Sequence, residues 1–386
     1  MSLCLGGCGT TVSRKSTSGY CRPCSNRFRA AITKPADAVR IDGIATPPEP
    51  GRLLEADKLV ARLTVKAASA TAKYTEALKQ VESLEKALGV MDALKACGAP
   101  QAIRPKFGSG TSEAMPWLVA SDWHSEERVD PRKINHLNAF SLEIADLRIE
   151  RFWQASERLV RLLKQDVKVP TVGVALLGDF ITGQIHGAEN AEANQLLPTE
   201  AICWVQDRIV AGLELLLSSY KGDVLVVCHS GNHSRTTQQN RLNGNENGHS
   251  LELLLYVHLL THFRNEKRIT INIAEGYHTF QEVYGKTIRF HHGHSLRYGG
   301  GRGGLFTPTY DAIDNWNKAK RADLDVFGHF HQMRDGGNFL CNGSLIGYNG
   351  FAQRIKASYE EPKQTLFLMD KKRGRTCTWP VYLERK

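Results

Sequence analysis

The chain has 386 residues and a formal net charge of +10 at pH 7, with 50 Lys and Arg against 40 Asp and Glu. This length is enough for one large hydrophobic core with smaller appended units, and the basic balance favours acidic partners, nucleic acid first. No apolar run approaches the roughly 20 residues that a membrane span needs, and the N-terminus lacks the pattern of a secretory signal, so we expect a cytoplasmic protein.

The first segment of the chain predicts a structural zinc site. Cys4, Cys8, Cys21 and Cys24 have the spacing C-x3-C-x12-C-x2-C, in which two close pairs flank a short loop. Four thiolates complete a closed tetrahedral site, and bound Zn²⁺ would supply most of the folding free energy of so short a segment. Two disulfides are the alternative, which a reducing compartment disfavours. We predict a zinc ribbon over residues 1–30.

The same segment is strongly basic. Between Ser13 and Ala30, arginine and lysine residues are interleaved with Tyr20 and Phe28, without an acidic residue. Cations beside aromatic rings suit phosphate contact and base stacking. This pattern favours nucleic-acid binding, DNA first, while a solvated basic face and a protein-docking ribbon are the alternatives.

A linker and a long helix come next. Residues 31–52 are rich in Pro, Ala and Gly, which is typical of a linker. Over residues 53–98, apolar residues such as Leu63 and Val81 recur at alternating steps of three and four. This heptad pattern predicts a long helix with coiled-coil character. It could pair with a second copy of the chain, giving a homodimer, or with its own body.

After a second linker at residues 99–115, residues 116–386 are predicted to form the main domain. Here strand-like apolar runs end repeatedly in Asp, Asn or His, often beside glycine. In layered α/β folds ligands bind where strands end, so five such patches in order indicate a metal centre. The residues concerned are Asp122, His124, Asp179, Asn232, His233, His291, His292, His294, His329 and His331.

Two of these patches carry ligand types one residue apart. His329 and His331 belong to the stretch Gly-His-Phe-His, and Asp122 and His124 have the same spacing. In an extended chain, residues i and i+2 point to the same side. We therefore expect the two side chains of each pair to point to the same side of the chain.

As an ordered set, the motifs D-x-H, G-D, G-N-H, H-G-H and G-H-x-H resemble those of calcineurin-like metallophosphoesterases, over about residues 116–350. They are most similar to DNA-repair exonucleases of the Mre11/SbcD type and to phage-type phosphoesterases. Protein phosphatases continue the second motif with Val-Asp-Arg-Gly, where this chain has residues 180–183, Phe-Ile-Thr-Gly. The resemblance implies an α/β fold, a four-layer α/β/β/α sandwich, and for a phage protein the cytoplasm of a bacterial host.

The resemblance also implies two metal ions and a role for each motif residue. The ligands of the first ion would be Asp122, His124, Asp179 and His331. Those of the second would be Asp179, Asn232, His292 and His329. Asp179 would bridge the ions, and His233 would act on the scissile phosphate as a general acid or as a stabilising cation.

The residue types support this reading chemically. Two divalent ions about 3.5–4 Å apart clamp a phosphate and lower the pKa of the water between them. Cations so close need a shared carboxylate. Nitrogen and oxygen ligation without thiolate suits Mn²⁺, Fe or Zn²⁺; we favour Mn²⁺, and Mg²⁺ is also possible.

The third motif departs from the family pattern at Ser234, where relatives usually carry an acid that orients the histidine. This loss affects the expected tuning of His233 and not the metal site. Arg235 could contact phosphate instead, with an ordinary surface arginine as the alternative. His186, soon after the second motif, could contact substrate.

Other polar residues near the motifs have simpler interpretations. His291 and His294 would pack around the metal centre, and Glu126 and Glu127 would be solvated loop acids.

Further segments would form the walls of the site and its cover. The glycine-rich residues 296–308 would place Arg297 and Arg302 beside the metals to grip a phosphate backbone; a flexible surface loop is the alternative. Helices are predicted over Ile134–Gln165 and Thr199–Ser218, and the basic C-terminal tail is predicted to be a hairpin at the edge of the second sheet.

We expect a two-metal phosphodiesterase, a DNA exonuclease or endonuclease that uses a metal-bridging hydroxide. The zinc ribbon, the net charge and the basic loop favour nucleic acid over a small phosphoester. One alternative is a phosphomonoesterase or small-nucleotide phosphodiesterase whose ribbon docks a partner, such as an ATPase or another replication or repair protein. The other is a non-catalytic scaffold with the metallophosphoesterase fold, which the intact ligand set disfavours.

Overall fold

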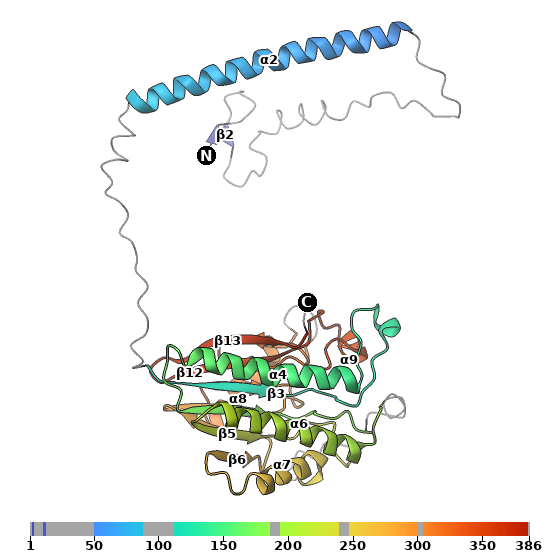
Figure 1. The fold of residues 1–386 in the computed structure, drawn as a ribbon, viewed down its shortest axis with the longest axis vertical. Helices are drawn as coiled ribbons and strands as arrows, with labels where there is room; N and C mark the ends of the chain where they lie inside the picture. Colours follow the sequence, from blue (N-terminus) through green and yellow to red (C-terminus); the bar gives the residue numbers. More distant parts are fainter. Residues whose placement is uncertain are drawn as a thin grey trace. The chain divides into compact units, whose positions relative to one another are not determined.

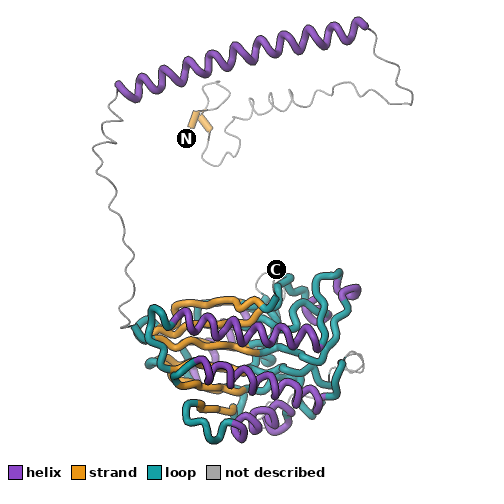
Figure 2. The backbone as a smooth tube through the Cα atoms, viewed as in Figure 1, coloured by secondary structure: helices purple, strands orange, loops and turns teal. Residues whose placement is uncertain are grey.

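A computed structural model of the protein describes residues 2–3, 11–12, 50–87, 112–185, 194–238, 247–299 and 304–384. The chain divides into two compact units, Met1–Ile103 and Arg104–Lys386 (Figures 1 and 2). The zinc-site cysteines, His186 and Arg302 lie outside the described residues.

The first unit contains one long helix. Helix α2 spans Pro50–Ala87, which is 38 residues and corresponds to roughly 57 Å at 1.5 Å per residue. Every side chain from residue 57 to 84 is exposed, including those of the heptad seam. The rest of the predicted helix, residues 88–98, lies outside the described residues. Strand β1 (Ser2–Leu3) pairs with β2 (Thr11–Val12) in antiparallel orientation. None of the described helices is long and apolar enough to cross a membrane.

The second unit contains two β-sheets. The strands of the six-stranded sheet are β3 (Ala114–Ala120), β4 (Thr171–Leu176), β5 (Asp223–Cys228), β6 (Ile269–Ile273), β12 (Lys363–Asp370) and β13 (Gly374–Tyr382). Those of the five-stranded sheet are β7 (Thr279–Val283), β8 (Lys286–Phe290), β9 (Leu324–Phe327), β10 (Arg334–Asp335) and β11 (Phe339–Cys341). The strand orders are β13-β12-β3-β4-β5-β6 and β10-β11-β9-β8-β7. Strands β3 to β6 run parallel, as do β8, β9 and β11.

The two sheets pack face to face, and helices cover their outer faces. Along β3, Leu118 and Ala120 belong to the core under the helices, whereas Trp117 and Val119 belong to the core between the sheets. This alternation follows the period of two along a strand. On the outer face of the five-stranded sheet, Ile313 of a further helix packs against the sheet. The predicted four-layer α/β/β/α order of this unit is therefore confirmed.

Helices α4 (Leu142–Leu163), α6 (Pro198–Ser219) and α7 (Leu251–His262) cover the six-stranded sheet, and α8 (Phe306–Ala319) covers the other (Figure 1). The short helices are η1 (Pro131–Ile134), η2 (Asn247–His249) and α9 (Gly350–Arg354). Helix α6 agrees with its prediction within one residue at each end.

The predicted start of the helix over Ile134–Gln165 was wrong. It was expected from Ile134, but α4 begins only at Leu142, where the side chain of Ser141 accepts a hydrogen bond from the first turn. The reason is local, because Asn135 and His136 have φ values of 56° and 58°, which no right-handed helix contains.

The C-terminal hairpin was assigned to the wrong sheet. Strands β12 and β13 form an edge of the six-stranded sheet, with Leu366 opposite Leu118 of β3. Strand β12 needs cover on both faces, because Leu366 lies in the core under the helices and Phe367 stacks on Trp117 between the sheets, with ring centroids 6.2 Å apart. Its position beside β3 provides both.

Candidate metal centre

The candidate ligands lie on loops that directly follow strands. Asp122 follows β3, Asp179 follows β4 and Asn232 follows β5, which are neighbouring parallel strands of one sheet. His292 follows β8 and His329 follows β9, which are parallel neighbours in the other. The carboxyl ends of parallel strands meet at one edge of a sheet, so packing the two sheets brings all five loops together.

Five residues of these loops other than glycine have a left-handed backbone. The φ value is 55° at Asp122, 46° at His124, 53° at Asp179, 70° at His329 and 55° at His331. Such a conformation costs about 1–3 kcal/mol for a residue other than glycine and persists where its surroundings impose it. The expectation that both i, i+2 pairs are extended was therefore wrong. Tight left-handed turns, and not the pleat of a strand, direct these side chains.

Glycines let these loops touch. The N–H of Asp122 donates to the carbonyl of Gly178 at 3.0 Å. A Cβ on Gly178 would lie 2.0 Å from the nitrogen of Gly231, and a Cβ on Gly231 would lie 2.1 Å from Oδ1 of Asp179. Both approaches exclude any side chain, which explains the glycine before Asp179 and before Asn232.

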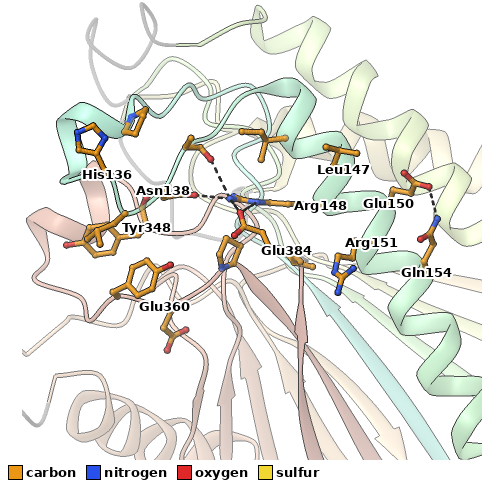
Figure 3. Close-up of a pocket in the computed structure, with 17 residues that line it drawn as sticks. His136, Asn138, Leu147, Arg148, Glu150, Arg151, Gln154, Tyr348, Glu360 and Glu384 are labelled. Atoms are coloured by element: carbon orange, nitrogen blue, oxygen red, sulfur yellow. Dashed lines mark hydrogen bonds and ion pairs between the residues drawn. The ribbon is translucent and has the colours of Figure 1, made fainter. Parts of the chain in front are cut away.

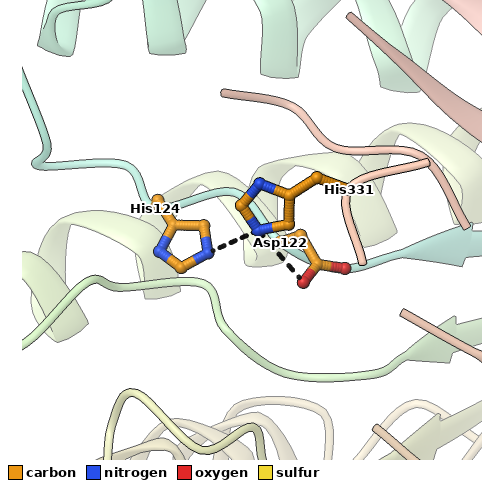
Figure 4. A group of neighbouring side chains, drawn as sticks. All are labelled: Asp122, His124 and His331. Carbon is orange, nitrogen blue, oxygen red and sulfur yellow. Dashed lines mark hydrogen bonds and ion pairs between the residues drawn. The ribbon is translucent and has the colours of Figure 1, made fainter. Parts of the chain in front are cut away.

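Asp122, His124 and His331 form a first group of potential ligands, with their polar atoms turned toward one another (Figure 4). Nε2 of His124 lies 3.1 Å from Nε2 of His331, which lies 3.6 Å from Oδ1 of Asp122. The carboxylate of Asp122 also accepts the backbone N–H of His329 at 2.9 Å. Two imidazole nitrogens and a carboxylate oxygen that converge are a donor set for a divalent cation.

The protonation states of this group suit a metal. Burial lowers the pKa of His124 well below its usual range, and neighbouring histidines lower it further. Burial also lowers the pKa of His331 to about 3. Both imidazoles are therefore neutral at pH 7, the form that binds metal. Burial raises the pKa of Asp122 to about 7, so a nearby cation would favour its ionised form.

Asp179, His292 and His329 form a second group. Nε2 of His292 lies 2.8 Å from Oδ2 of Asp179 and 3.1 Å from the side-chain oxygen of Asn232. Nδ1 of His292 donates to the carbonyl of Leu177 at 2.8 Å. Because that carbonyl keeps a proton on Nδ1, Nε2 is the nitrogen that would face a metal.

Asp179 joins the two groups. With His124 and His233 it forms a third set whose ligand atoms lie within 4.8 Å of one another. Burial would raise the pKa of Asp179, but the charge of His292 and its hydrogen bond hold that pKa well below its usual range. His331 belongs to the first group and His329 to the second. The buried groups could therefore hold divalent metal ions, with the Asp179 carboxylate between them.

His233 lies beside these groups. Its ring is edge-on to that of His124, with centroids 4.6 Å apart and planes at 85°. Its backbone N–H donates to Oδ1 of Asp179 at 2.8 Å, and its Nδ1 lies 2.9 Å from the carbonyl of Thr182. Burial lowers the pKa of His233.

Glu252 supports the loop of Asp179 and was missed in the sequence. Its carboxylate is fully buried and accepts the N–H of Phe180 at 2.7 Å and that of Gly231 at 2.8 Å. It thereby ties the second motif to the third. The available signal was its place as a lone acid in the apolar start of α7, residues 251–255.

The interpretation of Glu126 as a solvated loop acid was wrong. Its side chain is fully buried, and one carboxylate oxygen accepts the N–H groups of Thr182 and Gly183, each at 2.8 Å. Glu127 is half-buried. Its carboxylate accepts hydrogen bonds from the hydroxyl of Thr182 at 3.2 Å and from the side-chain amide of Asn349 at 3.1 Å. Both acids face inward because the turn after Asp179 presents its polar groups to them.

The candidate substrate contacts differ in their surroundings. The guanidinium of Arg235 donates to the carbonyls of Asn232, Thr237 and Gln238, so it braces its own loop. Arg297 is exposed.

The two extra histidines of the fourth motif lie close to the second group. His291 is buried, stacks on Phe327 with centroids 4.9 Å apart, and lies 3.5 Å from Oδ1 of Asp325. The ring of His294 lies 5.6 Å from that of His292.

A cavity of about 790 Å³ lies along α4, away from this centre (Figure 3). Arg148 forms part of its wall and donates to Asn138, to the carbonyl of Leu345 and to Glu384. No candidate metal ligand is among the residues that line this cavity.

No protein-family model matches the chain, and no curated protein matches it. Several solved structures do. An archaeal phosphodiesterase is 11% identical, with a TM-score of 0.29 over 69% of this chain and 99% of its own. A hypothetical protein from Pyrococcus horikoshii is 11% identical, with a TM-score of 0.34 over 70% and 89%. Vps29 from Chaetomium thermophilum is 11% identical, with a TM-score of 0.26 over 71% and 98%. At this level of similarity, the chemistry has to follow from the residues of the site itself.

Proposed function

We propose that the second unit is a metal-dependent phosphoesterase that hydrolyses phosphodiester bonds with two divalent ions. The position of Asp179 carries this proposal, because its carboxylate groups with His292 and His329 on one side and with His124 and His233 on the other. A carboxylate between two sets of imidazoles is what two closely spaced cations require. Such a pair of ions, when bound, polarises a phosphate and lowers the pKa of water between them.

The residues of the chain have distinct roles in this scheme. The two ligand groups bind and orient the ions, and Asn232 adds a neutral oxygen. His233 keeps a proton on Nδ1 toward the carbonyl of Thr182. It therefore acts through Nε2: in the doubly protonated imidazolium, Nε2–H gives its proton to the leaving oxygen, and the ring returns to the neutral form that keeps the proton on Nδ1.

We propose nucleic acid, DNA first, as the substrate. The support is the net charge of +10, the basic segment between Ser13 and Ala30 and the exposed Arg297 after the fourth motif. Positive charge raises the local concentration of a polyanion and steers its approach. A small phosphoester would need none of this.

We also propose that α2 pairs with α2 of a second copy of the chain. The described seam residues Val60, Leu63, Val81 and Leu84 are exposed, and a helix in water owes most of its stability to packing an apolar face. In a parallel, in-register pair, Lys66 would face Thr71 of the partner subunit. Lys73 would face the partner's Leu78, so these lysines meet no like charge.

The test of the enzymatic proposal uses the full chain with Mn²⁺, Mg²⁺ or Zn²⁺. End-labelled single- and double-stranded DNA are compared with p-nitrophenyl phosphate and bis(p-nitrophenyl) phosphate. We expect cleavage of DNA and of the diester, lost in Asp179→Asn and strongly reduced in His233→Ala. His262→Ala, an exposed histidine on α7, is the matched control. Intact DNA beside cleaved small esters would reject the nuclease, and no cleavage of any ester would reject the enzyme.

A further inference from the structure

His233 is oriented by a main-chain carbonyl and not by an acid. Its Nδ1 lies 2.9 Å from the oxygen of Thr182, and because a carbonyl only accepts, the proton must be on Nδ1. The neighbouring Ser234, where an acid was expected, takes no part in this contact. Its hydroxyl lies 2.6 Å from the hydroxyl of Ser250.

The opposite edge of the same peptide group is held by Glu126. The carbonyl of Thr182 and the N–H of Gly183 belong to one planar trans peptide, in which they point in opposite directions. Glu126 accepts that N–H at 2.8 Å and the N–H of Thr182, also at 2.8 Å. Fixing the N–H of a rigid plane also fixes the direction of its carbonyl. Accepting from the N–H also polarises the amide and strengthens its oxygen as an acceptor.

The local structure leaves little room for another arrangement. Gly183 has a φ of 64°, and a Cβ there would lie 2.5 Å from the carbonyl oxygen of His233. Glu126 is fully buried, and its second oxygen has no hydrogen-bond partner among the described residues. Burying a carboxylate costs free energy. The hydrogen bonds from the two N–H groups offset that cost and explain why Glu126 is buried here.

We propose that Glu126 is a positioning residue for His233, acting through the Thr182–Gly183 peptide to fix the tautomer and direction of the imidazole. The chain of contacts is carboxylate, N–H, carbonyl, Nδ1–H. It replaces the acid that the third motif lacks. The kinetic part of this inference rests on the proposed phosphodiesterase function, whereas the tautomer does not.

The first test compares Glu126→Leu, which removes the acceptor, with Glu126→Gln, which keeps an acceptor oxygen of the same reach. A proton donor matters most for a poor leaving group. We therefore expect Glu126→Leu to lower kcat on a thymidine dinucleotide about 10–100-fold, part of the roughly 10²–10⁴-fold that a general acid contributes. The loss on bis(p-nitrophenyl) phosphate should be clearly smaller, KM should change little, and Glu126→Gln should restore most of the rate.

The second test is a double-mutant cycle. If Glu126 acts through His233, then Glu126→Leu should lower kcat hardly any further in the His233→Ala background. Glu252→Leu is the matched control, because this equally buried glutamate holds Phe180 and Gly231 but not the Thr182–Gly183 peptide. The fall in kcat caused by Glu252→Leu should be the same in both backgrounds. An equally large loss from Glu126→Leu in both backgrounds would overturn the proposal.

The third test needs no catalysis, and its rejecting outcome needs no variant. Nitrogen-15 histidine spectra of the metal-free wild type should show His233 protonated on Nδ1, and that signal should be lost or shared between tautomers in Glu126→Leu. A wild-type imidazole protonated only on Nε2 rejects the proposal, even where Glu126→Leu does not fold. If the wild type cleaves no phosphodiester, the proposed function fails while this measurement still decides the contact.

Discussion

Nε2 of His292 lies 2.8 Å from Oδ2 of Asp179, and both side chains are buried. Burial alone would lower the pKa of His292, but the charge and hydrogen bond of Asp179 raise it to about 10. In the metal-free protein the two form an ion pair at pH 7. A proton on His292 therefore occupies the place where the second ligand group would bind a cation.

We expect metal binding to release this proton. A ligand imidazole must be neutral, so an ion that enters the second group displaces the proton of His292 at any pH below about 10. Because the metal-free form is the one that binds the proton, metal affinity should fall as pH falls, by about tenfold per pH unit for one proton. Calorimetric titration with Mn²⁺ in buffers of different ionisation enthalpy measures the release. An affinity independent of pH near neutrality would contradict it.

Asp179→Asn should remove both ions, whereas Asp122→Asn should weaken mainly one. The reason is that Asp179 lies in two of the potential ligand groups and Asp122 in one. Metal analysis of protein saturated with Mn²⁺ and then freed of unbound ion gives the stoichiometry directly, with His262→Ala as the control. Loss of a single ion in Asp179→Asn would show that the carboxylate does not bridge.

Asp325→Ala should destabilise the fold. Nε and Nη2 of Arg289 lie 2.6 Å and 2.9 Å from the two carboxylate oxygens of Asp325, and both side chains are about 1% exposed. Removing the acid leaves a buried guanidinium without its counter-charge, which costs about 3–5 kcal/mol. Urea unfolding of the metal-free protein measures this loss.

The double replacement Arg289→Met with Asp325→Leu is the control for that experiment. It removes both charges and keeps apolar volume, so it should cost much less than Asp325→Ala alone. A double variant as unstable as the single one would show that packing, and not the unpaired charge, sets the loss.

The edge at which the ligands gather could be predicted from the sequence. Asp122, Asp179 and His292 each follow an apolar run, and the ends of such strands meet where α/β folds bind ligands. Their division into groups could not be predicted this way. The approach of His331 to Asp122 depends on how two sheets pack, and on left-handed turns, which residues other than glycine adopt uncommonly.

Glu126 shows a second limit. It stands beside Glu127 on a loop, where neighbouring acids are usually solvated. Its burial depends on N–H groups of Thr182 and Gly183, more than fifty positions further along the chain. A pairing between a side chain and the backbone of a distant turn leaves no periodic pattern in the sequence.

The four cysteines of the predicted zinc ribbon lie outside the described residues, and the zinc site stays a prediction. We expect Cys21→Ser to lower bound Zn²⁺ by about one ion per chain without changing the Mn²⁺ content of the second unit. Metal analysis after dialysis measures both. Unchanged zinc would reject the ribbon. If the ribbon binds DNA, the same variant should also weaken DNA binding, in a way that depends on salt.

The full chain should be a dimer that depends on the seam of α2. Leu63 and Val81 are 55% and 49% exposed and lie on the seam, whereas Val65 is 69% exposed and lies off it. A charge at a seam position would be buried against the second copy, so Leu63→Glu with Val81→Glu should give monomers. Val65→Glu places the same charge on the same helix but outside the contact and should remain a dimer. Light scattering after size-exclusion chromatography gives the mass of each. A wild-type monomer rejects self-pairing, and dissociation by Val65→Glu as well would mean that the contact lies on another face of the helix.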